Sequence, residues 1–111
     1  MNRLQVYESA ALSIVEQADY YFENSGEALS FRWAAAIDQA IGSILKRPEI
    51  GARCRFRSQS LADVRWSLVP GFPKHMIFYQ YDRAELTVTV IEVLHGARDI
   101  RSILGDEEDT K

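Results

Sequence analysis

The stretch "LTVTVIEVLHGARD", residues 86–99, decides the fold that we predict for this chain. Its first half alternates apolar residues with Thr87 and Thr89, which is typical of a β-strand with one covered face. Its second half, "VIEVL", places apolar residues on both faces, so we expect an inner strand that is covered on both sides at that end. After the strand, Gly96 would supply a positive φ, and Asp99 stands where a helix N-cap belongs.

Two more strand candidates precede this stretch, and short turns join them to it. "VRWSLV" (64–69) alternates strictly, and "HMIFYQY" (75–81) is rich in aromatic and β-branched residues. The turn candidates are "PGFPK" (70–74) and "DRAE" (82–85). Turns this short favour an antiparallel meander of the last three strands. "RFRS" (55–58) is compatible with a further strand or with a loop.

The N-terminal half has helical periodicity. A short alternating run at residues 3–7 predicts a strand, and Ser9 is the expected N-cap of the helix that follows. The first apolar stripe contains Ala11, Ile14, Val15, Ala18, Tyr21 and Phe22. "ENSGE" (23–27) forms a turn, and Pro48 ends the second helix. The second stripe contains Leu29, Trp33, Ala36, Ile37, Ala40, Ile41 and Ile44. Two adjacent amphipathic helices predict an αα-hairpin.

The order of elements is therefore β-α-α-β-β-β. A last segment, "DIRSIL" (99–104), predicts a short C-terminal helix. Helices that are segregated from a run of strands indicate an α+β fold, with the hairpin packed on one face of a small antiparallel sheet. We expect a single domain over residues 1–104 and an acidic, frayed tail over residues 105–111.

Composition narrows the class of protein further. The 111 residues are 47% hydrophobic, and no apolar stretch approaches the roughly 18 to 20 residues that span a membrane. The single cysteine, Cys54, has no internal disulfide partner, and no signal peptide is evident, so we expect a cytoplasmic protein. Two histidines and one cysteine without metal-ligand spacing predict no metal site. No nucleotide-binding glycine motif occurs, so we expect no cofactor.

The net charge of −3 conceals a basic middle segment. Residues 46–75 contain seven basic and two acidic side chains, whereas residues 1–45 contain two basic and six acidic ones. This asymmetry favours an anionic partner, either a nucleic acid or an acidic protein segment. A solvated edge strand that is kept charged against aggregation is the alternative. The arginines that we expect to share one surface are Arg53, Arg55, Arg57 and Arg65.

His95 and Arg98 are the sharpest candidates for chemistry. Cleavage of RNA requires a proton-transfer group and cations that offset the phosphate charge. His95 could transfer protons, and Arg98 with Arg65 could hold a phosphate, with Tyr79 or Tyr81 in support. The competing interpretation is architectural, with a histidine that closes a strand and an arginine that pairs with a nearby carboxylate. We favour the architectural interpretation.

Three stretches, in this order and spacing, identify a known family. They are "RPEIGARCR" (47–55), "VRWSLVPGFPKHMIFYQYD" (64–82) and, above all, "VIEVLHGARD" (90–99). The chain resembles the ParE toxins of the RelE/ParE superfamily of toxin–antitoxin systems, from its first strand to Leu104. The resemblance implies the fold described above.

The resemblance also implies a function. It implies a growth-inhibiting, non-catalytic toxin that poisons DNA gyrase and is neutralised by a ParD-type antitoxin, without direct binding to nucleic acid. Relatives of the RelE type instead cut mRNA on the ribosome, which is the alternative that would use His95, Arg98 and Arg65. A third possibility is a non-toxic remnant that acts only as a binding module. The candidates for contact with the target or the antitoxin are Arg53, Arg55, Arg57, Arg65 and Arg98.

Overall fold

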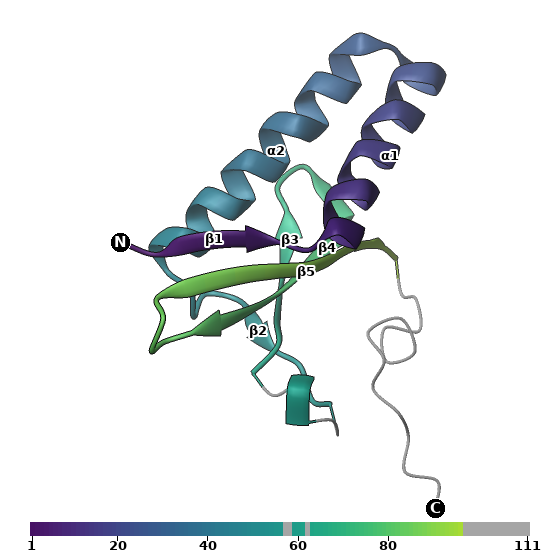
Figure 1. Cartoon of the computed structure of the whole chain (residues 1–111). Coiled ribbons are helices and arrows are strands. Elements are labelled where there is room, and N and C mark those ends of the chain that lie inside the picture. Colours follow the sequence, from purple (N-terminus) through teal and green to yellow (C-terminus); the bar gives the residue numbers. More distant parts are fainter. Residues whose placement is uncertain (57–58, 62, 97–111) are drawn as a thin grey trace, which may run out of the picture.

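The computed structural model describes residues 1–56, 59–61 and 63–96. Within these ranges a helical hairpin covers one face of a five-stranded sheet (Figure 1). The α+β class and the predicted order of elements are confirmed, with one further short strand and a 3-10 turn before the meander. The predicted C-terminal helix and the tail at residues 105–111 lie outside the described residues.

The sheet has the strand order β1-β5-β4-β3-β2. The elements are β1 (Arg3–Val6), α1 (Glu8–Ser25), α2 (Glu27–Lys46), β2 (Ala52–Arg53), η1 (Gln59–Leu61), β3 (Arg65–Val69), β4 (Phe72–Asp82) and β5 (Thr87–His95). The last three strands form the predicted antiparallel meander. β1 pairs in parallel with β5, so the sheet is mixed. Residues 55 and 56, the described part of "RFRS", lie outside any strand.

β5 is an inner strand, as its sequence predicts, because it lies between β1 and β4. Its pairing with β4 skips Ile91, which is therefore the extra residue of a β-bulge. Val88 and Val90, before the bulge, pack into the core under the helices. Ile91 instead joins a smaller apolar cluster that also contains Phe78 and Val64. The bulge explains why the end of this strand is apolar on both faces.

The main core lies between the hairpin and the sheet. Its members from the helices are Ala10, Trp33, Ala36, Ile37, Ala40 and Ile44, and its members from the strands are Val69, Ile77, Tyr79, Val88, Val90 and Val93. Full burial of a large apolar side chain contributes about 1.5–3 kcal/mol. The indole N–H of Trp33 also donates a hydrogen bond to the Ile14 carbonyl at 3.0 Å, which ties α2 to α1. No helix in the described ranges has the length and hydropathy to cross a membrane.

The predicted N-cap of the first helix is wrong. The helix begins at Glu8, with Tyr7 at the N-cap position and no side-chain cap. Ser9 lies inside the first turn, and its hydroxyl donates to the Ile91 carbonyl at 3.4 Å. The backbone N–H of Tyr7 donates to the Val90 carbonyl at 2.9 Å, so pairing with β5 continues up to the start of the helix. Tertiary pairing, rather than local capping preference, sets where the helix begins.

The predicted apolar stripe of the first helix is correct only in part. Ile14, Ala18 and Tyr21 pack against the main core, as expected. Val15 and Phe22 are instead more than half exposed, at 54% and 57%. They lie on the edge of the stripe, beside the residues that reach the core, so their apolar side chains stay in contact with solvent.

Candidate functional site

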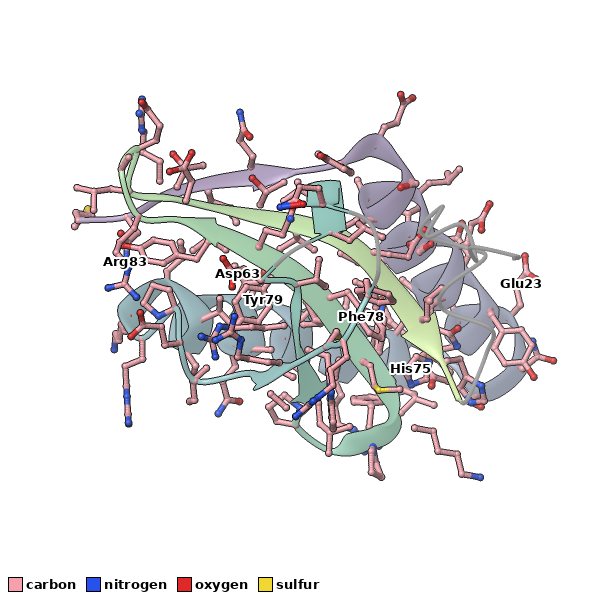
Figure 2. All side chains as sticks on the ribbon, turned by 90° about the horizontal axis from the view of Figure 1, so that it is seen from below. Glu23, Asp63, His75, Phe78, Tyr79 and Arg83 are labelled. Carbon is pink, nitrogen blue, oxygen red and sulfur yellow. The ribbon has the colours of Figure 1, made fainter. Side chains whose placement is uncertain are left out.

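β4 carries two polar side chains that are buried at separate points along its length, Tyr79 and His75 (Figure 2). Both side chains lie on the face of the sheet that the helices cover. Tyr79 belongs to the main core, and the His75 ring lies 4.6 Å from the Trp33 ring, centroid to centroid. Their surroundings differ in hydrogen bonding. Of the site residues predicted from the sequence, Arg65 lies near Tyr79, and His95 lies near His75.

Tyr79 and Arg65 hold the loop that follows α2, and we name this arrangement the loop clamp. The Tyr79 hydroxyl accepts a hydrogen bond from the Gly51 N–H at 2.8 Å and donates to the Pro48 carbonyl at 2.9 Å. The Arg65 guanidinium donates to the carbonyls of Glu49 and Gly51, at 3.2 and 2.9 Å. Burial raises the pKa of the Tyr79 hydroxyl above its ordinary value, so the hydroxyl stays protonated and can donate.

Gly51 explains the spacing of the P-x-x-G pattern in the sequence. A Cβ at this position would lie 2.5 Å from the Tyr79 hydroxyl and 2.8 Å from the Trp66 carbonyl oxygen. Only glycine allows the loop to approach the sheet this closely. Tyr79 and Arg65, which the sequence offered as groups for RNA cleavage, therefore have a structural use in the clamp.

The other arginine candidates lie in different settings. Arg53 is paired with Arg65 across β2 and β3, and it forms an exposed ion pair with Asp63. Exposed pairs of this kind contribute about 0–1 kcal/mol, so Arg53 can exchange partners at little cost. Arg55 is exposed. Arg57 and Arg98 lie outside the described residues.

His95 lies directly opposite His75 in the pairing of β5 with β4, and we name these two residues the histidine pair. Their ring centroids are 4.7 Å apart, with the rings edge to face. The Gly96 N–H donates to the Lys74 carbonyl at 2.6 Å, which makes the neighbouring pair of residues hydrogen-bonded. The histidine pair is therefore of the non-hydrogen-bonded type, in which side chains approach most closely. Gly96 has a φ of 74°, which confirms the predicted positive φ.

Aromatic rings surround His75, which is only 4% exposed. The rings of Tyr21, Trp33 and Phe72 lie 6.3, 4.6 and 6.2 Å from it. Neither ring nitrogen has a hydrogen-bond partner among the residues that the structure describes. Burial, and after it the charge of His95, lowers the pKa of His75 from 6.5 to about 4. His75 is not among the site residues predicted from the sequence, although its alternation with Ile77 and Tyr79 indicates that it faces the core.

A hollow of about 280 Å³ opens beside the histidine pair. Its lining includes Ser13, Glu16, Gln17 and Tyr20 of α1, together with His75 and His95. The buried Glu92 carboxylate accepts hydrogen bonds from the Ser13 hydroxyl at 2.9 Å and from the Val93 N–H at 3.0 Å. Over residues 1–56, 59–61 and 63–96, no group of three or more His, Cys, Asp or Glu side chains could hold a metal ion together.

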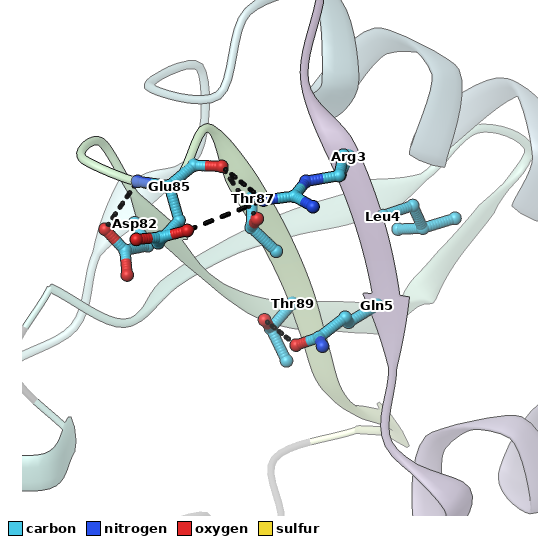
Figure 3. Close-up of a pocket in the computed structure, with 7 residues that line it drawn as sticks. All are labelled: Arg3, Leu4, Gln5, Asp82, Glu85, Thr87 and Thr89. Carbon is cyan, nitrogen blue, oxygen red and sulfur yellow. Dashed lines mark hydrogen bonds and ion pairs between the residues drawn. The ribbon is translucent and has the colours of Figure 1, made fainter.

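A second hollow, of about 470 Å³, lies between β1 and the turn that joins β4 to β5 (Figure 3). Its polar side chains bond mainly to one another. Arg3 forms an ion pair with Glu85, and the Thr89 hydroxyl donates to the Gln5 side chain at 3.2 Å. Because these groups are already partnered and exposed, this hollow is a weaker candidate for a site than the one beside the histidine pair.

Solved structures of toxin–antitoxin systems share this fold. A chain of the chromosomal ParDE system from P. aeruginosa matches with a TM-score of 0.69 and 12% identity, over 87% of this chain and 98% of that one. The intact RelBE complex of E. coli matches with a TM-score of 0.56 and 16% identity, over 88% and 100%. The RelBE2 complex of Mycobacterium tuberculosis matches with a TM-score of 0.58 and 17% identity, over 85% and 96%. At these identities the likeness shows the fold alone.

Sequence families give a more specific result. A comparison with curated protein sequences found no match. Residues 6–100 match the family model described as the ParE toxin of the type II toxin–antitoxin system parDE. This range includes β5, the histidine pair and the loop clamp. The chain therefore belongs to the ParE toxin family of type II toxin–antitoxin systems.

Proposed function

We propose that this ParE-family protein inhibits DNA gyrase without catalysing a reaction, and that a ParD-like antitoxin neutralises it in the cytoplasm. The observation that carries the proposal is the match of residues 6–100 to the ParE toxins of parDE systems. The structural neighbours from ParDE and RelBE complexes support a protein antitoxin as the partner.

The loop clamp supports the non-catalytic function over the RNA-cleaving alternative. An RNA-cleaving site would need Arg65 free to bind a phosphate, but its guanidinium donates to two backbone carbonyls. Release of Arg65 would leave those carbonyls without their partner, which costs free energy wherever water does not replace it. The ring of His95 lies against the ring of His75. The pKa of His75, near 4, leaves His75 uncharged at neutral pH, so His75 cannot help to offset phosphate charge there. Arg98, the third candidate of that alternative, lies outside the described residues.

The antitoxin is expected to dock on β1 and the outer face of α1. β1 is an edge strand, and all four of its residues are exposed. Leu4 and Val6 on this strand, and Leu12 and Val15 on α1, are exposed apolar side chains at 38–54%. Exposed apolar surface of this kind is typical of a partner site. An antitoxin segment that folds on binding would add a strand to the edge and lay an apolar helix face over α1.

The basic residues of the β2 region are expected to receive acidic side chains of the antitoxin or target. Arg53 and Arg55 are exposed there. The ion pair of Arg53 with Asp63 is on the surface, so a carboxylate of a partner can replace Asp63 at little cost. Complementary charge would raise the rate of association more than the affinity.

Controlled expression separates the proposal from its alternatives. We expect growth arrest with SOS induction and altered plasmid supercoiling, and inhibition of purified gyrase by the purified protein. Rapid ribosome-dependent loss of mRNA with intact supercoiling would overturn the gyrase proposal in favour of an endoribonuclease. Full growth on expression of the soluble protein would favour a remnant that only binds.

Variants test the roles of individual surfaces. His95→Gln is expected to keep most of the toxicity, because the proposal gives this residue no catalytic step. Val6→Lys and Leu12→Lys are expected to weaken antitoxin binding and leave toxicity intact. Leu68→Lys is the matched control, since the exposure of Leu68, 47%, lies between those of Val6 and Leu12, at 38% and 54%, but Leu68 is on β3. Loss of antitoxin binding in the control, or retention in both docking variants, would overturn the assignment of the surface.

A further inference from the structure

We propose that His75 and His95 form a binding site for one divalent transition-metal ion of the Zn²⁺ class, beside the hollow between α1 and the ends of β4 and β5. The proposal goes beyond the toxin function and does not depend on it. Spacing in the sequence predicts no such site, because the two histidines are twenty residues apart. The site exists only through the register of β4 with β5.

The backbone brings the two imidazoles within reach of one ion. They occupy a non-hydrogen-bonded cross-strand position, as the Gly96–Lys74 hydrogen bond requires, and their ring centroids are 4.7 Å apart. Zinc binds imidazole nitrogen at about 2.0–2.1 Å. Two nitrogens on a common ion are then about 3–4 Å apart, a separation that rings at this distance reach by rotation of their side-chain torsions.

No hydrogen bond from the described part of the chain competes with a metal for the nitrogens of His75. Neither nitrogen has a hydrogen-bond partner in the described part of the chain, although the residue is only 4% exposed. A buried polar atom without a partner is costly, and most such atoms in native proteins are satisfied by protein, water or a bound ion. A neutral imidazole has one unprotonated nitrogen, and this nitrogen is the metal ligand.

The charge around the hollow favours a cation over an anion. Glu16 contributes a carboxylate to the lining, and the hydroxyl of Ser13, which also lines the hollow, donates to the Glu92 carboxylate. No lysine or arginine of the described ranges lines the hollow. Lys74, the neighbour of His75 on β4, is exposed. Among the described residues, a phosphate or carboxylate ligand would therefore find no lysine or arginine here, whereas a divalent ion would gain from the carboxylate of Glu16.

The site is open. Because no third His, Cys, Asp or Glu of the described residues can join the group, water or a donor from a partner protein would complete the coordination. Structural zinc sites usually have four protein ligands, so we expect a weaker, exchangeable ion here. Binding would link β4 to β5 at the point where the chain leaves the sheet through Gly96.

Titration of the full chain with ZnCl₂ tests the proposal. We expect a saturable 1:1 heat signal in calorimetry, chemical-shift changes in both imidazole rings by NMR, and an unfolding midpoint that rises with zinc concentration. His95→Gln is expected to weaken binding by more than roughly tenfold, since even loss of an outer hydrogen bond to a ligand costs 10–100-fold. Lys74→Gln is the matched control, and we expect it to bind zinc as the natural chain does.

A second variant keeps the test valid if loss of a histidine affects folding. His75→Phe preserves a ring in the aromatic surroundings and removes both nitrogens, so we expect a folded protein whose unfolding midpoint no longer responds to zinc. Absence of saturable binding below millimolar zinc in the natural chain would overturn the proposal. Equal binding by the natural chain, His95→Gln and His75→Phe would also overturn it, because surface carboxylates would then be the ligands. Neither outcome bears on gyrase inhibition, which is measured separately.

Discussion

Tyr79 and His75 lie four residues apart on the same strand, and both are buried on the side of the sheet that faces the helices. Their polar atoms nevertheless differ in hydrogen bonding. The Tyr79 hydroxyl has two hydrogen bonds, because the loop at residues 48–51 closes over it. His75 has none within the described chain, because aromatic side chains and an open hollow surround it. A buried polar group stabilises a fold when it is paired and destabilises it when it is not. The polar group at one end of β4 is therefore fully hydrogen-bonded, and the one at the other end has no partner among the described residues.

The largest effect is expected at the loop clamp, from Gly51→Ala. The added Cβ would meet the Tyr79 hydroxyl at 2.5 Å and the Trp66 backbone at 2.8 Å, so the loop must move and break its hydrogen bonds. We expect a loss of more than about 3 kcal/mol in the free energy of unfolding, measured by urea denaturation. Gly42→Ala is the control, because a Cβ there meets no atom of the described chain within 4 Å and alanine favours the helix. Equal stability of both variants would show that the loop is not closely packed.

The histidine pair is expected to produce the next largest effect, as a dependence of stability on pH. His75 has a folded pKa of about 4 against 6.5 in the unfolded chain, so the unfolded state takes up a proton first as pH falls. Stability is unaffected above pH 6.5 and declines from there towards pH 4, by on the order of 3 kcal/mol in total. Urea denaturation across this range measures the decline. His75→Phe should flatten the curve, and an identical slope in the natural chain and the variant would contradict the assignment.

Tyr79→Phe compares the paired end with the unpaired end directly. Removal of the hydroxyl leaves the Gly51 N–H and the Pro48 carbonyl without their partner, and we expect a loss of about 2 kcal/mol. His75→Phe removes nitrogens that have no partner in the described chain, so without added metal at neutral pH it should be neutral or stabilising. A loss of stability in Tyr79→Phe without a loss in His75→Phe would sharpen the comparison. Tyr20→Phe, at an exposed position, is the control for loss of a hydroxyl.

The smallest effect is expected from Gly96→Val at the end of β5. Its φ of 74° fits a β-branched residue badly, while no atom of the described residues lies within 4 Å of an added Cβ, so the expected cost is backbone strain. We expect a loss of about 1–3 kcal/mol, near the lower end of that range because this residue ends a strand. Thermal unfolding is a sufficient measurement. A midpoint equal to that of the natural protein would show that the chain here adopts another conformation without cost.

Much of the fold was predictable because periodicity reports burial. The alternation of β5, the apolar stripe of α2 and the short turns predicted the inner strand, the core-facing helix and the meander, and all three are confirmed. The first helix was harder to predict. Its start depends on the pairing of Tyr7 with β5, and the exposure of Val15 and Phe22 depends on which side of the helix packs against the core. Neither is a local property of the sequence.

The candidate site was predictable only in part. His95 and Arg65 were identified from their neighbours in the sequence, but their contacts were not. Arg65 holds backbone carbonyls rather than a free anion, and the closest aromatic contact that the structure shows for His95 is the unpredicted His75. Register in a sheet joins residues that are distant in the chain, and no spacing pattern in a single sequence encodes it.

The sequence by itself determined the family and the α+β order of elements. Motifs such as "VLHGARD" and hydrophobic periods are patterns of neighbouring residues, so they can be recognised before any tertiary contact is known. It also determined the positive φ at Gly96, since few other residues accept that conformation. Only the tertiary structure decided which polar residues are partners. It placed Tyr79 beneath a loop that satisfies its hydroxyl, and it placed His75 against His95 with its nitrogens unpaired in the described chain. The physical reason is that hydrogen bonding depends on distances of about 3 Å between groups from separate strands and loops, which folding alone brings together.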